Sequence, residues 1–127
     1  MTNGTRTVLI IDDEVVLADL LAAIVEGANC RPVVAADGAE GLALARTLCP
    51  DVVFCDMSMP GLTGAEVLRA IREEPSTANV PRVLVSGHEH PDLPSIGAHA
   101  FLAKPFRPDA VLHLLDSLLP QQSERAA

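Results

Sequence analysis

Three aspartates stand directly after runs of apolar residues. Asp12 and Asp13 close one run, and Asp56 closes a second run that Pro60 prevents from continuing. A continuous apolar run of this length is typical of a buried strand in a parallel sheet. An unpaired carboxylate inside such a strand would be costly to bury, so each aspartate is expected at the carboxyl end of its strand. Open α/β sheets bind their ligands at that edge.

Helix capping is the competing explanation for these acids. A helix N-terminus needs only one capping carboxylate, so capping accounts for Asp13 but not for three acids together. We expect Asp13 to cap the helix that follows it. Two later apolar runs end in other polar residues, Ser86 and Lys104.

Five apolar runs alternate with helical patterns, which indicates a parallel sheet with helices on both faces. The expected strands are residues 7–11, 31–36, 52–56, 82–85 and 100–103. Pro32 removes a ladder donor and favours an edge position for the second strand. Right-handed crossovers then favour the strand order 2-1-3-4-5 of flavodoxin-like folds. We therefore predict an α/β fold with three layers, built on a doubly wound, five-stranded parallel sheet.

Apolar stripes with helical spacing follow four of the five strands. The stripes are Leu17, Leu20, Leu21, Ile24 and Ala28; Leu42, Ala45 and Leu48; Val67, Leu68 and Ile71; and Val111, Leu114, Leu115 and Leu118. Asp37 with Glu40, and Thr63 with Glu66, have the spacing of capping boxes.

The segment after the fourth strand lacks a regular helical pattern. Pro91, Pro94 and Gly97 fall within seven residues, and a proline inside a helix costs about 3 kcal/mol. We therefore expect the fourth helix to be shortened or absent, replaced by a mobile loop or a single turn between residues 91 and 97.

The predicted strand order brings Asp12, Asp13 and Asp56 together, with Ser86 and Lys104 beside them. Three adjacent carboxylates repel one another unless a cation compensates. Hard oxygen ligands suit Mg²⁺, which also accepts phosphate oxygens. A carboxylate can form an acyl phosphate, so Asp56 is the candidate nucleophile. Ser86 and Lys104 would then bind the phosphoryl oxygens.

These residues resemble a two-component response-regulator receiver domain. The resemblance rests on residues 10–14, on residues 56–60 with Gly64, on Ser86, and on residues 104–106. It implies that Asp56 is the phosphoacceptor, that Ser86 is the switch hydroxyl, that Lys104 binds the phosphoryl group, and that Phe101 is the switch aromatic. It implies a Mg²⁺ site formed by Asp12, Asp13, Asp56 and the backbone carbonyl of Ser58. A cis Lys104–Pro105 peptide bond is also expected.

The resemblance further implies a signalling role. The phosphoryl group would come from a phosphohistidine on a sensor histidine kinase or histidine phosphotransfer protein. A conformational change would then reach a downstream protein target in a phosphorelay. Such a domain is not an enzyme in the usual sense, because it catalyses only its own phosphorylation and dephosphorylation. Phe101, Gly87 and the short spacing from Ser86 to Lys104 depart from the usual pattern.

Composition sets further expectations. The chain has 127 residues and a net charge of −8, which argues against direct nucleic-acid binding. No apolar run approaches the roughly 20 residues of a membrane span, so a cytoplasmic protein is expected. We also expect a monomer or a weak dimer. Residues 7–119 would form one domain, with flexible termini at 1–6 and 120–127. Cys30, Cys49 and Cys55 are expected to be packing residues.

Three alternatives remain open at this stage. A haloacid-dehalogenase-like phosphatase would need a second aspartate at the position of Ser58. A flavodoxin-type FMN carrier would need a hydroxyl- and glycine-rich loop where residues 12–14 are acidic. An atypical receiver acting mainly as a protein-binding module, with an altered helix-four face, is compatible with the missing helical pattern.

Overall fold

The computed structural model describes residues 5–88 and 92–119. Its strands are β1 (Arg6–Ile11), β2 (Cys30–Ala35), β3 (Val52–Asp56), β4 (Arg82–Ser86) and β5 (Ala100–Ala103). Its helices are α1 (Val15–Gly27), α2 (Gly38–Leu48), α3 (Gly64–Glu73) and α4 (Pro108–Leu118), and a 3₁₀ turn, η1 (Pro94–Ile96), precedes β5.

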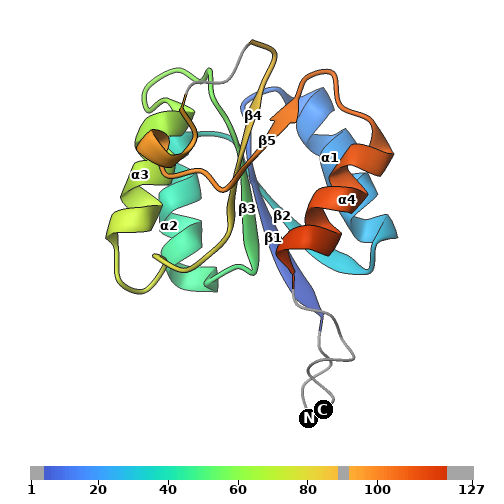
Figure 1. The fold of residues 1–127 in the computed structure, drawn as a ribbon, viewed down its shortest axis with the longest axis horizontal. Helices are drawn as coiled ribbons and strands as arrows, with labels where there is room; N and C mark the ends of the chain where they lie inside the picture. The colour runs from blue at the N-terminus through green and yellow to red at the C-terminus, as the bar shows by residue number, and fades with distance from the viewer. Residues whose placement is uncertain (1–4, 89–91, 120–127) are drawn as a thin grey trace.

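The five strands form one parallel sheet in the order β2-β1-β3-β4-β5. Helices α1 and α4 cover one face, and α2 and α3 cover the other (Figure 1). The predicted fold class, strand order and edge position of the second strand are therefore confirmed. Pro32 lies in the edge strand β2, where its missing N–H leaves no central ladder bond unmade.

Side chains alternate between the two faces of the sheet and form two apolar cores. Val53 and Cys55 of β3 face the α2–α3 layer, whereas Val52 and Phe54 face the α1–α4 layer. All five residues of β3 are buried. Because both faces of the central strand are covered, its sequence is a continuous apolar run up to Asp56.

Of the two predicted capping boxes, the one at α3 forms in full, whereas the one at α2 lacks its reciprocal bond because Glu40 Oε1 accepts from the Ala36 N–H. The Asp37 carboxylate accepts from the Glu40 N–H at the start of α2, and Thr63 with Glu66 forms a capping box at the start of α3. The predicted cap by Asp13 is wrong, because Glu14 is the N-cap residue of α1 and its side chain makes no capping bond.

The buried face of α1 also differs from the predicted stripe. Ala18, Leu21 and Val25 are buried, while Leu20 is 45% exposed. Almost every residue of α1 is apolar, so the pattern is compatible with more than one buried face. Small Ala18 allows the helix to lie close to the sheet, which turns Leu20 outward.

The fourth helix is replaced by the single turn η1, as predicted; Pro91 lies outside the described residues. Arginines from the neighbouring elements donate to the carbonyl groups around this turn. Arg69 Nε donates to Ser95 O, and Arg72 Nη1 donates to Pro94 O. The buried Arg82 Nε donates to Gly97 O. Guanidinium groups therefore bind the carbonyls of this short turn from α3 and β4, including Pro94 O, which also accepts from the Gly97 N–H.

One boundary and one burial prediction of the sequence analysis need correction. Arg6, assigned to a flexible terminus, is the first residue of β1, pairs in register with Cys30 and is buried. Cys30 and Cys55 are buried as expected, but Cys49 is exposed. Cys49 has left-handed backbone (φ 47°) at the C-cap of α2, which turns the chain before its side chain can enter the core. Within residues 5–88 and 92–119, no helix has the length and apolar character of a membrane span.

Arg82 should be a determinant of stability. Its Nη1 also donates to Ala78 O at 2.8 Å and to Val80 O at 3.0 Å. Arg82→Met keeps the volume but leaves buried carbonyls without these donors, so we expect the free energy of unfolding to fall by about 2–4 kcal/mol in urea titrations. Arg107→Met, which removes an exposed guanidinium paired with Asp109, should change it by less than about 0.5 kcal/mol. Equal effects would contradict this role.

Candidate phosphoacceptor site

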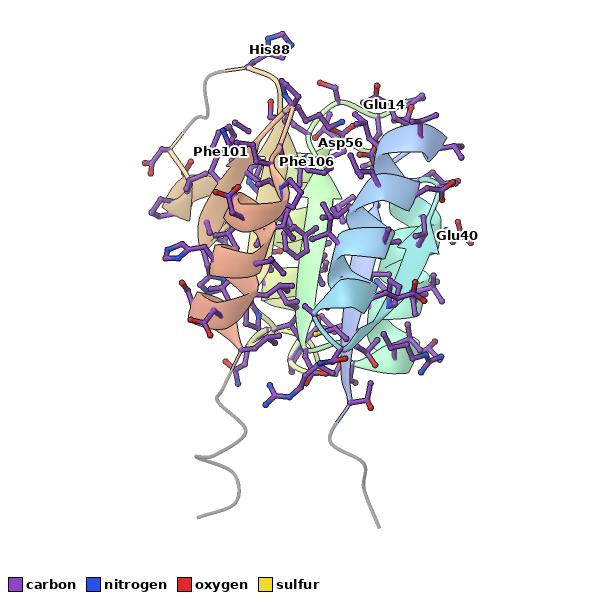
Figure 2. The ribbon with its side chains drawn as sticks, turned by 90° about the vertical axis from the view of Figure 1, so that its right-hand side faces the viewer. Glu14, Glu40, Asp56, His88, Phe101 and Phe106 are labelled. Carbon is purple, nitrogen blue, oxygen red and sulfur yellow. The ribbon has the colours of Figure 1, made fainter. Side chains whose placement is uncertain are left out.

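The strand register brings the predicted acids together at one end of the sheet. Ile11 of β1 pairs with Cys55 of β3, so Asp12 and Asp56 follow side by side at the carboxyl ends of these strands. One carboxylate oxygen from each of Asp12, Asp13 and Asp56 lies within 4.8 Å of the others. Asp12 and Asp56 are buried and Asp13 is exposed. Asp56 lies at this end of the sheet, close to Glu14 (Figure 2).

The Lys104 ammonium lies among these carboxylates. Its Nζ is 2.8 Å from Asp56 Oδ1 and 3.3 Å from Asp12 Oδ2. The Lys104 N–H donates to Ser86 O at 2.9 Å, which continues the β4–β5 ladder beyond Ala103. The Lys104–Pro105 peptide bond is cis, as expected. The end of β5 therefore places the Lys104 ammonium at the cluster of three carboxylates.

Burial and charge shift the pKa values of the central groups in opposing ways. Burial raises the pKa of the Asp56 carboxyl; the Lys104 hydrogen bond counteracts this, and the charges of Asp12 and Asp13 add to it. Burial alone would lower the pKa of Lys104, but its hydrogen bonds to Asp56 and Glu14 and the charge of Asp12 raise it overall. Lys104 is therefore a permanent cation, whereas the ionised form of Asp56 is disfavoured.

Ser86 and the loop after β3 complete this edge of the sheet. Ser86 is buried, and its Oγ accepts from the His88 N–H at 3.1 Å. The Gly64 N–H donates to Met57 O at 2.9 Å. A Cβ on Gly64 would lie 2.4 Å from Asp56 O, so glycine is required where α3 begins against the loop. Ser58 is an exposed residue of that loop; its role as a carbonyl ligand stays a prediction.

Phe101 lies apart from the acids. It is half-buried on β5 and packs against the core on the α2–α3 side of the sheet. Together with Pro105, Phe106 and Leu114, it lines a groove of about 420 Å³ between β5 and α4. Phe101 therefore connects the core to a surface groove.

The donor set fits a hard divalent cation. The acid cluster offers only carboxylate oxygens. Asp12 and Asp56 are buried, and the single Lys104 ammonium does not balance the negative charge of the three carboxylates. Oxygen ligands in this arrangement suit Mg²⁺ better than a transition metal. A phosphate-binding loop for FMN is incompatible with it, because the acids would repel the phosphate.

Comparison with known proteins identifies this arrangement. The family model of the response regulator receiver domain matches residues 8–116 of this chain. The chain belongs to this family. The receiver domain is thus a signalling domain and not a conventional enzyme. Membership of this family excludes the haloacid-dehalogenase-like phosphatase and the flavodoxin-type FMN carrier.

Relatives of this receiver include full-length regulators. The DNA-binding response regulator MtrA of Mycobacterium bovis is 29% identical over 133 residues, which cover 100% of this chain and 56% of MtrA. The nitrate/nitrite response regulator protein NarL of Escherichia coli is 33% identical over 113 residues, covering 86% of this chain and 52% of NarL. The chain therefore spans about half the length of these curated relatives.

The solved structures agree with the fold. The chemotaxis protein CheY4 of Vibrio cholerae matches with a TM-score of 0.86 and 29% sequence identity, covering 91% of this receiver and 100% of the CheY4 chain.

One residue of the receiver site was missed by the sequence analysis as a site residue. Glu14 Oε1 lies 2.5 Å from Lys104 Nζ, although the two residues are 90 positions apart. The only sequence signal was its place as the third acid in the run from Asp12 to Glu14. That run suggested negative charge, but nothing in it indicated which cation the third acid would meet.

The raised pKa of Asp56 predicts a pH-dependent stability. Between the ordinary aspartate pKa of about 3.9 and the raised folded-state value, the folded receiver binds more protons than the unfolded chain. The free energy of unfolding contributed by this group therefore falls as pH rises through that window. Asp56→Asn removes the effect, and without divalent cations we expect its Tm to exceed that of the wild type at pH 7.

Thermal unfolding from pH 3.5 to 8 in chelator checks this expectation. The Tm difference between Asp56→Asn and wild type should grow as pH rises and then level off. Asp19→Asn, which removes an exposed charge on α1, is the control for net charge. A Tm difference that is independent of pH, or that is matched by the control, would contradict the assignment.

Proposed function

We propose that this receiver accepts a phosphoryl group on Asp56 and passes the signal to a protein partner. The observation that carries the proposal is the meeting of three carboxylates within 4.8 Å with an ammonium 2.8 Å from Asp56 Oδ1. The donor would be a phosphohistidine on a sensor histidine kinase or histidine phosphotransfer protein. We assign this function to residues 7–119.

The group transfer is a displacement at phosphorus. An Asp56 carboxylate oxygen forms the new O–P bond, the N–P bond of the phosphohistidine breaks, and its electron pair returns to the imidazole, which takes a proton from solvent. The Lys104 ammonium and the Ser86 hydroxyl would bind the phosphoryl oxygens. Hydrolysis of the acyl phosphate would later restore the free carboxylate.

Mg²⁺ would be held by Asp12, Asp13 and Asp56 with the backbone carbonyl of Ser58. Asp13 would be a direct ligand, and Asp12 would act through water. Bound Mg²⁺ supplies positive charge that offsets the repulsion between the nucleophile and the phosphoryl oxygens. The buried Asp12 would then have two cationic partners instead of one.

Ser86 and Phe101 would couple the site to the surface. The Ser86 hydroxyl, now accepting from the His88 N–H, would turn toward the phosphoryl group, and Phe101 would move further into the core. Because the fourth helix is reduced to η1, the signalling face would be this segment with α4, or the surface around α1. Dimerisation through a fourth helix is not expected.

The partners are part of the proposal. A downstream protein is expected because the net charge of −8 disfavours contact between this domain and a nucleic acid. MtrA is named as DNA-binding, and the segment matched here is about half of it. A cytoplasmic location and a monomer or weak dimer complete the proposal.

Phosphate labelling tests the function directly. Acetyl phosphate with Mg²⁺ should add one phosphoryl group to the wild type, seen as a mass increase of intact protein, and none to Asp56→Ala or in the presence of chelator. The bond should hydrolyse in alkali, as an acyl phosphate does. Glu40→Gln, which neutralises a carboxylate outside the acid cluster, should be labelled normally. Label retained by Asp56→Ala would refute the assignment, and an unlabelled wild type would favour the protein-binding module.

Asp13 is predicted to be required for metal binding. Asp13→Ala removes one direct carboxylate ligand, so the Mg²⁺ affinity should fall at least about tenfold in calorimetric or fluorescence titrations. Asp19→Ala removes an equal charge one turn or more away and should lower the affinity less than about twofold. Unchanged affinity in Asp13→Ala would show that the ion binds elsewhere.

A further inference from the structure

The Lys104 ammonium lies close to three carboxylates. They belong to Asp56 at 2.8 Å, Glu14 at 2.5 Å and Asp12 at 3.3 Å. Lys104 is therefore fully engaged, and a phosphoryl group that needs this ammonium must displace one of its partners.

The three partners differ in their access to water. The side chains of Asp56 and Asp12 are 5% and 6% exposed, whereas that of Glu14 is 57% exposed. Separating Asp12 from the ammonium would leave a buried charge, which is costly. Separating Glu14 exchanges an exposed ion pair for hydration, which costs little. Glu14 is thus the partner that can be released.

Within the described part of the chain, the Glu14 carboxylate contacts Lys104 and does not cap its own helix. Glu14 occupies the N-cap of α1, yet its side chain makes no capping bond. Its N–H donates to Asp12 Oδ1 at 2.9 Å, which fixes the β1–α1 loop so that the side chain reaches back over the site. The carboxylate is directed to Lys104 instead of to the helix N-terminus.

We propose that Glu14 is a positioning residue that competes with the phosphoryl group for Lys104. In the unphosphorylated receiver Glu14 retains the ammonium at the site; on phosphorylation the phosphoryl oxygens take its place and Glu14 moves into solvent. The inference rests on the proposed function. It predicts that Glu14 opposes the phosphorylated state and that its removal stabilises that state.

Beryllofluoride, a non-covalent analogue of the phosphoryl group, tests the competition without turnover. Its affinity is measured at saturating Mg²⁺ for the full chain and three variants. Glu14→Gln removes the charge. Glu14→Asp keeps the charge but is one methylene shorter, and aspartate at an N-cap is drawn to its own helix. Asp19→Asn removes an exposed acid on α1 that is outside the site.

Both Glu14 variants should bind beryllofluoride about three- to tenfold more tightly than the wild type, the range expected for loss of one exposed competing ion pair. Asp19→Asn should stay within twofold. If Glu14→Asp matched the wild type while Glu14→Gln bound more tightly, general charge would be the cause and the competition would be refuted. Unchanged affinity in both Glu14 variants would refute it too.

Failure of the proposed function gives a different result. A wild type that neither binds beryllofluoride nor is labelled at Asp56 would overturn the phosphoacceptor role and the inference with it. A wild type that does both, with no change in the Glu14 variants, would overturn only the role of Glu14.

Discussion

Mutual repulsion among carboxylates is the constraint on which this structure depends. Asp12, Asp13 and Asp56 lie within 4.8 Å, and one ammonium opposes them. Such a cluster persists only where the backbone holds it, because the side chains alone would move apart. The parallel ladder from β1 to β5 supplies that rigidity: Asp12, Asp56 and Lys104 lie at the ends of strands whose register is fixed by their neighbours. The apolar core thus holds together a site whose carboxylates repel one another.

The same sheet tolerates the loss of a regular helix beside β5. The turn η1 has its own backbone hydrogen bonds, and Arg69, Arg72 and Arg82 add side-chain hydrogen bonds to the carbonyls around it. Two of these arginines lie on α3, whose N-terminus packs against the loop after Asp56 through Gly64. Helix α3 is therefore in contact with both the loop after Asp56 and the η1 segment.

Sequence patterns correctly predicted the structural features that depend on residues close together in the chain. The run before Asp56 predicted β3 because a strand covered on both faces must be apolar throughout, and Pro94 with Gly97 predicted the single turn. The buried face of α1 was wrong at Leu20, since an almost wholly apolar helix gives no contrast between its faces. The contact between Glu14 and Lys104 could not be predicted, because strand order places Lys104 near the acids but does not determine which way the flexible Glu14 side chain turns. The exposure of Cys49 depended on a left-handed residue that the sequence does not mark.

The long sequence separation of the site has a consequence for biosynthesis. Lys104 is 90 positions from Glu14, so at about 5–20 residues per second it is made roughly 5–18 s later. All the acids of the site are translated before their ammonium partner, and the first three strands can pair before β5 exists. The nascent acidic edge must meanwhile be neutralised by ions from the surrounding solution. When β5 is complete, the Lys104 ammonium replaces these solution ions as the countercharge.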